Sequence, residues 1–242
     1  ETRHVERRRA SRLMVPLVLI PGMMCDARMW GGIPTALYPR RVTHFLPIGA
    51  DSMADLARSF LRDAPQHFAL AGLSMGGILA MEVLAQAPDR VERLALLDTN
   101  PRAELPEVQA RREPQIARAL QGGLAGVMRD EMKPNYLAKG EGQKEVLDLC
   151  LDMALTLGPQ AFASQSRALR DRADRQAVLA AFKGPALVLM GAEDRLCPRD
   201  RHELMHELMP QSWLVIIEGA AHLPPLERPY ETTAALRRWL EE

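Results

Sequence analysis

The chain has 242 residues, of which 47% are hydrophobic, and its 31 basic side chains balance 31 acidic ones. This length suits one domain, or one domain carrying an insertion, and the apolar content excludes a chain that is disordered over most of its length. The zero formal net charge argues against nucleic-acid binding, which needs a basic excess, and no apolar run approaches the roughly 20 residues that cross a bilayer.

The cysteines indicate a reducing compartment. Cys25, Cys150 and Cys197 are odd in number, widely spaced and form no C-x-x-C pair. A disulfide framework or a cysteine-based metal site is therefore not expected, and the prediction is a cytoplasmic protein.

The elements expected along the chain alternate between strands and helices. Residues 1–13 are polar and rich in arginine and are expected to form a flexible basic extension. Continuous apolar runs, which are typical of strands buried on both faces, predict strands over Val15–Ile20, Val42–Pro47, Phe68–Ala71, Leu94–Asp98, Ala186–Met190 and Trp213–Glu218. Amphipathic stretches predict helices over Ala27–Tyr38, Met53–Asp63, Gly77–Ala87, Arg199–Met209 and Tyr230–Leu240. This alternation predicts a doubly wound α/β fold with a mostly parallel sheet.

One interval interrupts this alternation. Between Asp98 and Ala186 the sequence holds helix-like segments separated by prolines and glycines, and no convincing strand. A structureless loop of that size is rare. The interpretation is a helical cap over 103–183, inserted into a core made of 14–102 and 184–242.

The strongest chemical signal is Gly72-Leu73-Ser74-Met75-Gly76-Gly77. It follows a predicted strand and opens a predicted helix, which is the context of the G-x-S-x-G turn that presents a nucleophilic serine. The alternative is a serine that caps a helix after a glycine-rich turn.

A serine nucleophile needs a base, and the base needs an acid to orient it. His222 and Asp194 each follow a predicted strand, where α/β sheets build their sites. The order Ser74, Asp194, His222 matches the order expected for this architecture. Glu193 and Asp98 are rival acids, and Asp194 is favoured over both.

Acyl transfer also needs donors for the developing oxyanion. The backbone N–H groups of Met75, which follows the serine, and of Met23, in the loop after the first strand, are expected to supply them. Their neighbourhood predicts a substrate pocket lined by four further residues: Gly22, Met24, Leu196 and Leu223.

A competing pattern is His202-Glu203-Leu204-Met205-His206, which matches the H-E-x-x-H zinc motif. It falls on a predicted helix that lies between the acid and the base along the chain, where the fold expects an outer covering helix. A zinc hydrolase that uses His202 and His206 is kept as a minor alternative, and no metal site is expected.

On Leu19-Ile20-Pro21-Gly22, the serine motif and the segments around Asp194 and His222, the sequence resembles the α/β-hydrolase superfamily, in its small capped esterase-like members. The resemblance covers the chain from about Val15 except the cap, although Pro21-Gly22 stands where many relatives have His-Gly. Many relatives also begin with an additional antiparallel hairpin, for which there is no room before Val15, so a sheet of about six strands is expected. Ser74 excludes the aspartate-nucleophile branches of this fold. Relatives of this kind include esterases, enol-lactonases, thioesterases, C–C bond hydrolases and cofactor-free haloperoxidases.

The expected function is hydrolysis of a carboxylic ester of a small or medium, largely apolar molecule through Ser74, His222 and Asp194, without a cofactor. The alternatives are the same triad acting on a lactone, thioester or C–C bond, and a non-catalytic protein that binds a ligand in the same pocket. The expected partner is a small molecule, and the sequence leaves the oligomeric state open.

Overall fold

A six-stranded sheet forms the centre of the protein. The computed structural model describes residues 15–140 and 142–242, so the extension expected over 1–13 lies outside the described residues. The sheet has the order β2-β1-β3-β4-β5-β6, and every neighbouring pair is parallel. Its strands are β1 (Leu17–Ile20), β2 (Val42–His44), β3 (Phe68–Leu73), β4 (Val91–Leu97), β5 (Ala186–Gly191) and β6 (Trp213–Ile217). The predicted parallel α/β sheet is confirmed.

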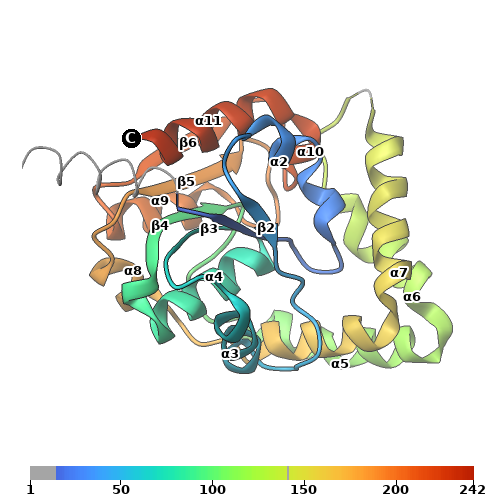
Figure 1. Ribbon diagram of the computed structural model, residues 1–242. Helices are drawn as coiled ribbons and strands as arrows, with labels where there is room; N and C mark the ends of the chain where they lie inside the picture. The colour runs from blue at the N-terminus through green and yellow to red at the C-terminus, as the bar shows by residue number, and fades with distance from the viewer. Residues whose placement is uncertain (1–14, 141) are drawn as a thin grey trace, which may run out of the picture.

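Helices cover both faces of this sheet (Figure 1). In the core they are η1 (Ala27–Trp30), α2 (Ile33–Ala36), α3 (Met53–Asp63), α4 (Met75–Gln86), η2 (Pro88–Arg90), α9 (Arg199–Leu208), α10 (Pro224–Glu227) and α11 (Pro229–Glu241). The single helix predicted over Ala27–Tyr38 is wrong. The chain breaks into η1 and α2 there because Gly31 takes a positive φ of 53°.

Alternate residues of the strands supply two separate hydrophobic cores. Val18, Ile20, Leu70 and Leu96 point to the face covered by α3, α4, α8 and α9. Their neighbours Leu17, Leu19, Ala71 and Leu97 point to the face covered by η1, α2 and α11, where Trp30 and Trp239 are fully buried. Both faces of the central strands are therefore apolar, which is why their sequences read as continuous hydrophobic runs.

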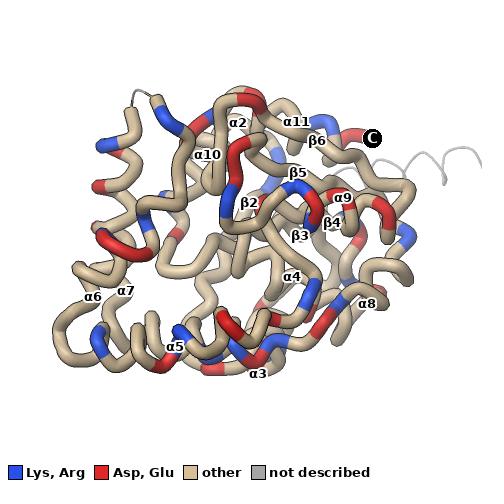
Figure 2. The backbone as a smooth tube through the Cα atoms, turned by 180° about the vertical axis from the view of Figure 1, so that it is seen from behind, with Lys and Arg blue, Asp and Glu red and all other residues tan. Residues whose placement is uncertain are grey.

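The helical insertion lies between β4 and β5. It contains α5 (Pro106–Arg118), η3 (Ala119–Gly123), α6 (Leu124–Gly126), η4 (Val127–Met132), η5 (Lys133–Asn135), α7 (Gln143–Arg170) and α8 (Gln176–Ala181). The helices α5 to α7 gather on one side of the molecule, whereas α8 contacts the core helices α4 and α9. In Figure 2, basic and acidic residues are interleaved along the outer helices, so the charge balance is local as well as overall.

The helix α7 is divided into two parts. Gly158 has a φ of 85° and is followed by Pro159, so the helix changes direction there, as Figure 1 shows. By length and composition alone, α7 is the one described helix that is apolar enough to cross a membrane. Each part nevertheless buries side chains against protein, including Met153 in the first part and Phe162 in the second.

Candidate active site

Ser74 sits in a strained turn between β3 and α4. Its φ of 54° and ψ of −116° lie outside the regions that a residue with a side chain normally occupies. The turn is possible because glycines flank it: a Cβ on Gly72 would overlap the carbonyl of Gly76, and a Cβ on Gly76 would overlap the carbonyl of Ile20 in β1. The close approach of three backbone segments thus raises the Ser74 side chain above the sheet.

The structure brings Ser74, His222 and Asp194 together. Ser74 Oγ lies 2.9 Å from His222 Nε2, and His222 Nδ1 lies 3.0 Å and 2.9 Å from the two carboxylate oxygens of Asp194. An ionised carboxylate only accepts hydrogen bonds, so Nδ1 carries the proton and Nε2 is free to accept one from the serine hydroxyl. His222 and Asp194 are each only 5% exposed. The side chains therefore form one directed chain of hydrogen bonds from serine to carboxylate.

Asp194 is held as the charged member of this chain. Burial alone would raise its pKa, but the imidazole of His222 and the amide of Cys197 outweigh that effect and hold the pKa of Asp194 below its ordinary value. Its Oδ1 also accepts the N–H groups of Leu196 and Cys197, at 2.9 and 3.1 Å. The rival Glu193 is exposed to solvent and takes no part.

The second rival, Asp98, lies beneath Asp194 as a fully buried carboxyl group. Its Oδ1 accepts the N–H of Gly191 at 2.9 Å, and its Oδ2 has no hydrogen-bond partner among the described residues. Burial, followed by the negative charge of Asp194, raises the pKa of Asp98 well above its ordinary value. This shift favours the neutral form of Asp98, and a neutral carboxyl group cannot be the anion that stabilises an imidazolium.

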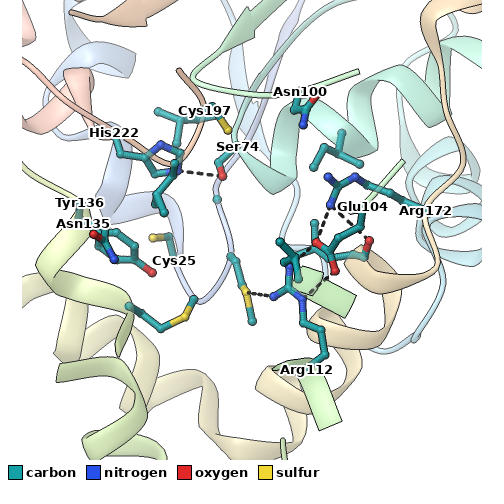
Figure 3. A pocket seen from close by; sticks show the side chains of 18 of the residues that line it. Cys25, Ser74, Asn100, Glu104, Arg112, Asn135, Tyr136, Arg172, Cys197 and His222 are labelled. Atoms are coloured by element: carbon teal, nitrogen blue, oxygen red, sulfur yellow. Dashed lines mark hydrogen bonds and ion pairs between the residues drawn. The ribbon is translucent and has the colours of Figure 1, made fainter. Parts of the chain in front are cut away.

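Glu227 fixes the loop that carries His222. Its carboxylate accepts the N–H groups of Ala221 and Leu223, the two neighbours of His222, and also that of Ala138 in the insertion. Figure 3 places Tyr136 on the same side of the cavity as His222, whose backbone N–H donates to the Tyr136 carbonyl at 2.9 Å. The imidazole is thus positioned from both the core and the insertion.

Two backbone N–H groups near Ser74 are not used by the fold. Met75 is the first residue of α4, where an N–H has no partner within the helix. Met23 follows Gly22, and a Cβ on Gly22 would lie 3.6 Å from the Cβ of Ser74. Neither N–H has an acceptor within hydrogen-bond distance among the described residues. Both are available to a group bound at the serine.

The loop that carries Met23 is anchored by the insertion. The N–H of Met24 donates to Oε1 of Gln165 in α7 at 2.8 Å, and Nε2 of Gln165 donates to the Pro47 carbonyl at 3.0 Å. Gln165 is fully buried and Met24 is 1% exposed. Met24 therefore packs in the core, and its expected place in the pocket lining is not what the structure shows.

A cavity of about 360 Å³ opens beside Ser74 (Figure 3). Three of the four residues predicted for the pocket, Gly22, Leu196 and Leu223, line it. Its other walls come largely from the insertion, and the prediction missed their polar members, among them Glu104, Arg112, Asn135, Tyr136 and Arg172. The sequence did hold one signal for Arg112. It shares the buried face of α5 with Ile116, four residues away, so its side chain could have been expected to point inward.

The structure does not join His202 and His206 in a metal site. His202 is fully buried and accepts the N–H of Thr99 at 3.2 Å, and burial lowers its pKa to about 4. His206 contacts Ser212 instead, at 2.8 Å. Among residues 15–140 and 142–242, the one cluster of three possible ligands is Asp194, Cys197 and His222. There both nitrogens of His222 already face Ser74 and Asp194.

The buried Asp98 generates a prediction about stability. A carboxyl whose pKa is raised in the folded state binds more protons than the unfolded chain, so its contribution to stability falls as pH rises from its ordinary pKa toward the raised one. Asp98→Asn copies the protonated form and removes this loss. The free energy of unfolding of the variant, relative to that of the unsubstituted protein, is expected to rise between mildly acidic and mildly alkaline pH, by at most about 1.4 kcal/mol per pH unit in denaturant titrations. The exposed Asp89→Asn is the control, and a pH-independent difference for Asp98→Asn would contradict the assignment.

Gln165 generates a second prediction. Gln165→Leu keeps much of the volume but leaves the Met24 N–H and the Pro47 carbonyl unpaired in a buried place. The free energy of unfolding is expected to fall by about 1–3 kcal/mol for each unpaired group. Gln176→Leu is the control, because the Gln176 side chain contacts only the exposed Asp174. Equal denaturant midpoints for the two variants would rule out this role of Gln165.

Comparison with known proteins agrees with this fold. The model of the alpha/beta hydrolase family matches residues 17–236. The chain is 26% identical to a pimeloyl-[acyl-carrier protein] methyl ester esterase of Pectobacterium carotovorum, over 88% of this chain and 89% of the relative. A thermophilic esterase from Thermogutta terrifontis, solved with malate bound, superposes with a TM-score of 0.85 at 29% identity, covering 93% of this chain and 89% of that one.

The fold is shared more widely. The enol-lactonase of Burkholderia xenovorans superposes with a TM-score of 0.83 at 24% identity, over 94% of this chain and 92% of that one. Because the family model matches most of the sequence, the chain belongs to the alpha/beta hydrolase family.

Proposed function

We propose that the protein is a serine hydrolase that cleaves carboxylic esters of small or medium-sized molecules through Ser74, His222 and Asp194. The observation that carries this proposal is the continuous hydrogen-bond chain from Ser74 Oγ through the His222 ring to the Asp194 carboxylate. The esterases among the relatives support the same reaction class. The cavity beside Ser74 bounds the size of the substrate.

The reaction has two halves. His222 Nε2 takes the hydroxyl proton while Ser74 Oγ attacks the ester carbonyl, and the tetrahedral oxyanion accepts hydrogen bonds from the N–H groups of Met23 and Met75. Collapse of this intermediate expels the alcohol, which takes the proton from His222, and leaves an acyl-enzyme on Ser74. Water then repeats the cycle and releases the acid. These steps need no metal or organic cofactor.

The lining suits a substrate with an apolar section. Leu73, Ile78, Val108, Leu169 and Leu223 contribute to the wall of the cavity. Burial of such a section is worth about 25 cal/mol per Å² of apolar surface removed from water. An acyl chain or an alcohol of modest length therefore supplies binding energy close to the reacting carbonyl.

Ser74 is tested by covalent labelling. A fluorophosphonate is expected to label the unsubstituted protein and Ser59→Ala, in which a half-buried serine on α3 is removed, but not Ser74→Ala. Intact-protein mass and a peptide map locate the adduct. Failure to label, or labelling that survives Ser74→Ala, contradicts the proposed mechanism.

A panel of esters, lactones and thioesters then identifies the bond that is cleaved. The highest kcat/KM is expected for an ester, and a higher value for another kind of bond assigns the site to that bond.

Asp194 and Asp98 make a matched pair of carboxyl substitutions. Asp194→Asn removes the charge that stabilises the imidazolium and favours the wrong ring tautomer, so kcat is expected to fall by about 10⁴-fold. Asp98→Asn mimics the neutral form that the raised pKa of Asp98 favours and is expected to change kcat less than about tenfold. Steady-state rates on one ester measure both, and the reverse order of effects would move the catalytic acid to Asp98.

A further inference from the structure

Three of the charged side chains that line the cavity lie across from Ser74 and His222. Figure 3 shows Glu104, Arg112 and Arg172 together on the opposite side from the serine and the histidine. All three line the cavity, and their side chains are only 3%, 11% and 9% exposed. Charged groups that are removed from water in this way need compensation from their surroundings.

The positive charges of the two arginines are only partly neutralised by Glu104. Glu104 accepts two hydrogen bonds from Arg112, at 2.6 and 3.0 Å, and a third from Arg172 at 2.8 Å. Two guanidinium groups therefore share one carboxylate. Glu131, the other acidic residue in the lining, is paired with Arg118. The cluster of Glu104, Arg112 and Arg172 keeps one positive charge beyond what its own carboxylate neutralises.

Each arginine also has a donor nitrogen that lacks an oxygen partner. Nη1 of Arg112 contacts only the sulfur of Met23, at 3.8 Å, and a thioether is a weak acceptor. Among the described residues, Nη2 of Arg172 has no acceptor within hydrogen-bond distance, while its Nε and Nη1 are bound to Arg102, Leu169 and Glu104. Burial holds the pKa of Arg172 below its ordinary value, although that of a guanidinium stays high enough for it to remain charged.

The cluster is close to the reacting centre. The Met23 side chain touches Arg112, and the Met23 backbone N–H is one of the two proposed oxyanion donors. The apolar residues Leu105, Val108 and Leu169 line the same cavity. A molecule whose ester carbonyl rests at Ser74 thus reaches the arginines across an apolar section.

We propose that Arg112 and Arg172 bind a carboxylate at the far end of the substrate, so that the substrate class is the monoester of a dicarboxylic acid. The planar guanidinium groups match a carboxylate, whose two oxygens can accept from both free nitrogens, and the bound anion neutralises the excess charge. Glu104 holds the two arginines in place and limits the site to one negative charge. This assignment rests on the proposed function, because it takes Ser74 as the place of the cleaved ester.

The test compares substrates of equal shape and different charge. Monomethyl esters of unbranched dicarboxylic acids, from succinate to suberate, are paired with the methyl esters of the corresponding monoamides. At the best chain length the acid is expected to exceed the amide in kcat/KM by about tenfold or more, since hydrogen bonds to charged groups are the stronger ones. Equal values at every length, or preference for the amide, would overturn the proposal.

Substitutions test whether the preference for the acid over the amide depends on Arg112 and Arg172. Arg112→Met and Arg172→Met are expected to bring the ratio of acid to amide close to one, whereas Arg58→Met, on the exposed side of α3, keeps it. Glu104→Gln removes the internal carboxylate and is expected to raise the ratio. If the arginine variants do not fold, the direction of the Glu104→Gln effect still decides. An unchanged ratio in folded arginine variants, or a lower one in Glu104→Gln, counts against the site.

Binding to Ser74→Ala separates this proposal from the catalytic one. Calorimetry with the monomethyl ester and its amide partner measures the preference for a carboxylate without turnover. This test of the carboxylate site is therefore valid even if no ester is cleaved and no fluorophosphonate adduct forms. Hexanoate and hexyl phosphate, compared as inhibitors or as ligands, distinguish the two kinds of anion. Tighter binding of the phosphate would replace the carboxylate in the assignment.

Discussion

The site depends on how closely β1, β3 and the start of α4 approach one another. Gly72 and Gly76 leave no room for a side chain against the carbonyls of Gly76 and Ile20. This contact forces the chain to turn sharply at Ser74, which accounts for the positive φ of that residue. Because the sheet and the helix are both rigid, the serine keeps its direction, and the loops that carry His222, Asp194 and Met23 are arranged around it.

Three acids near the site have different tasks because their surroundings differ. Asp194 faces an imidazole and backbone N–H groups, and it is charged. Asp98 faces Asp194 and a single N–H group, and its raised pKa favours the neutral form. Burial raises the pKa of Glu227 while three N–H groups act against this effect, and Glu227 anchors the histidine loop. Only one of the three carboxyl groups is thus directed at the imidazole.

Much of the core could be predicted because its signals are local. The apolar runs of the strands and the glycines around Ser74 are read directly from the sequence, and the parallel sheet follows from them. Asp194 and His222 could be selected because both follow strands whose carboxyl ends meet at one edge. The break between η1 and α2 could have been predicted too, since Gly31-Gly32 interrupts the helical pattern.

The walls of the cavity could not be predicted in this way. Arg172 and Glu104 come together only when the insertion folds back on itself, and no spacing along the chain encodes that contact. Met24 was misplaced for a similar reason: its N–H is taken by Gln165, which is distant in sequence, and its side chain turns into the core. Pocket composition depends on long-range packing, whereas the strained turn at Ser74 depends on neighbours in the chain.

The break in α7 at Gly158 has a consequence for how such a protein diversifies. The part after the break carries Gln165, which holds the loop next to the serine, so its sequence is constrained by the chemistry of the core. The α5 helix and residues 131–136 contribute wall residues but do not contain this anchor. Substitutions that adapt the cavity to another substrate can therefore fall in α5 or in residues 131–136 while Gln165 is preserved. The insertion in this sense carries both an anchor for the loop beside the serine and wall segments that lie outside that anchor.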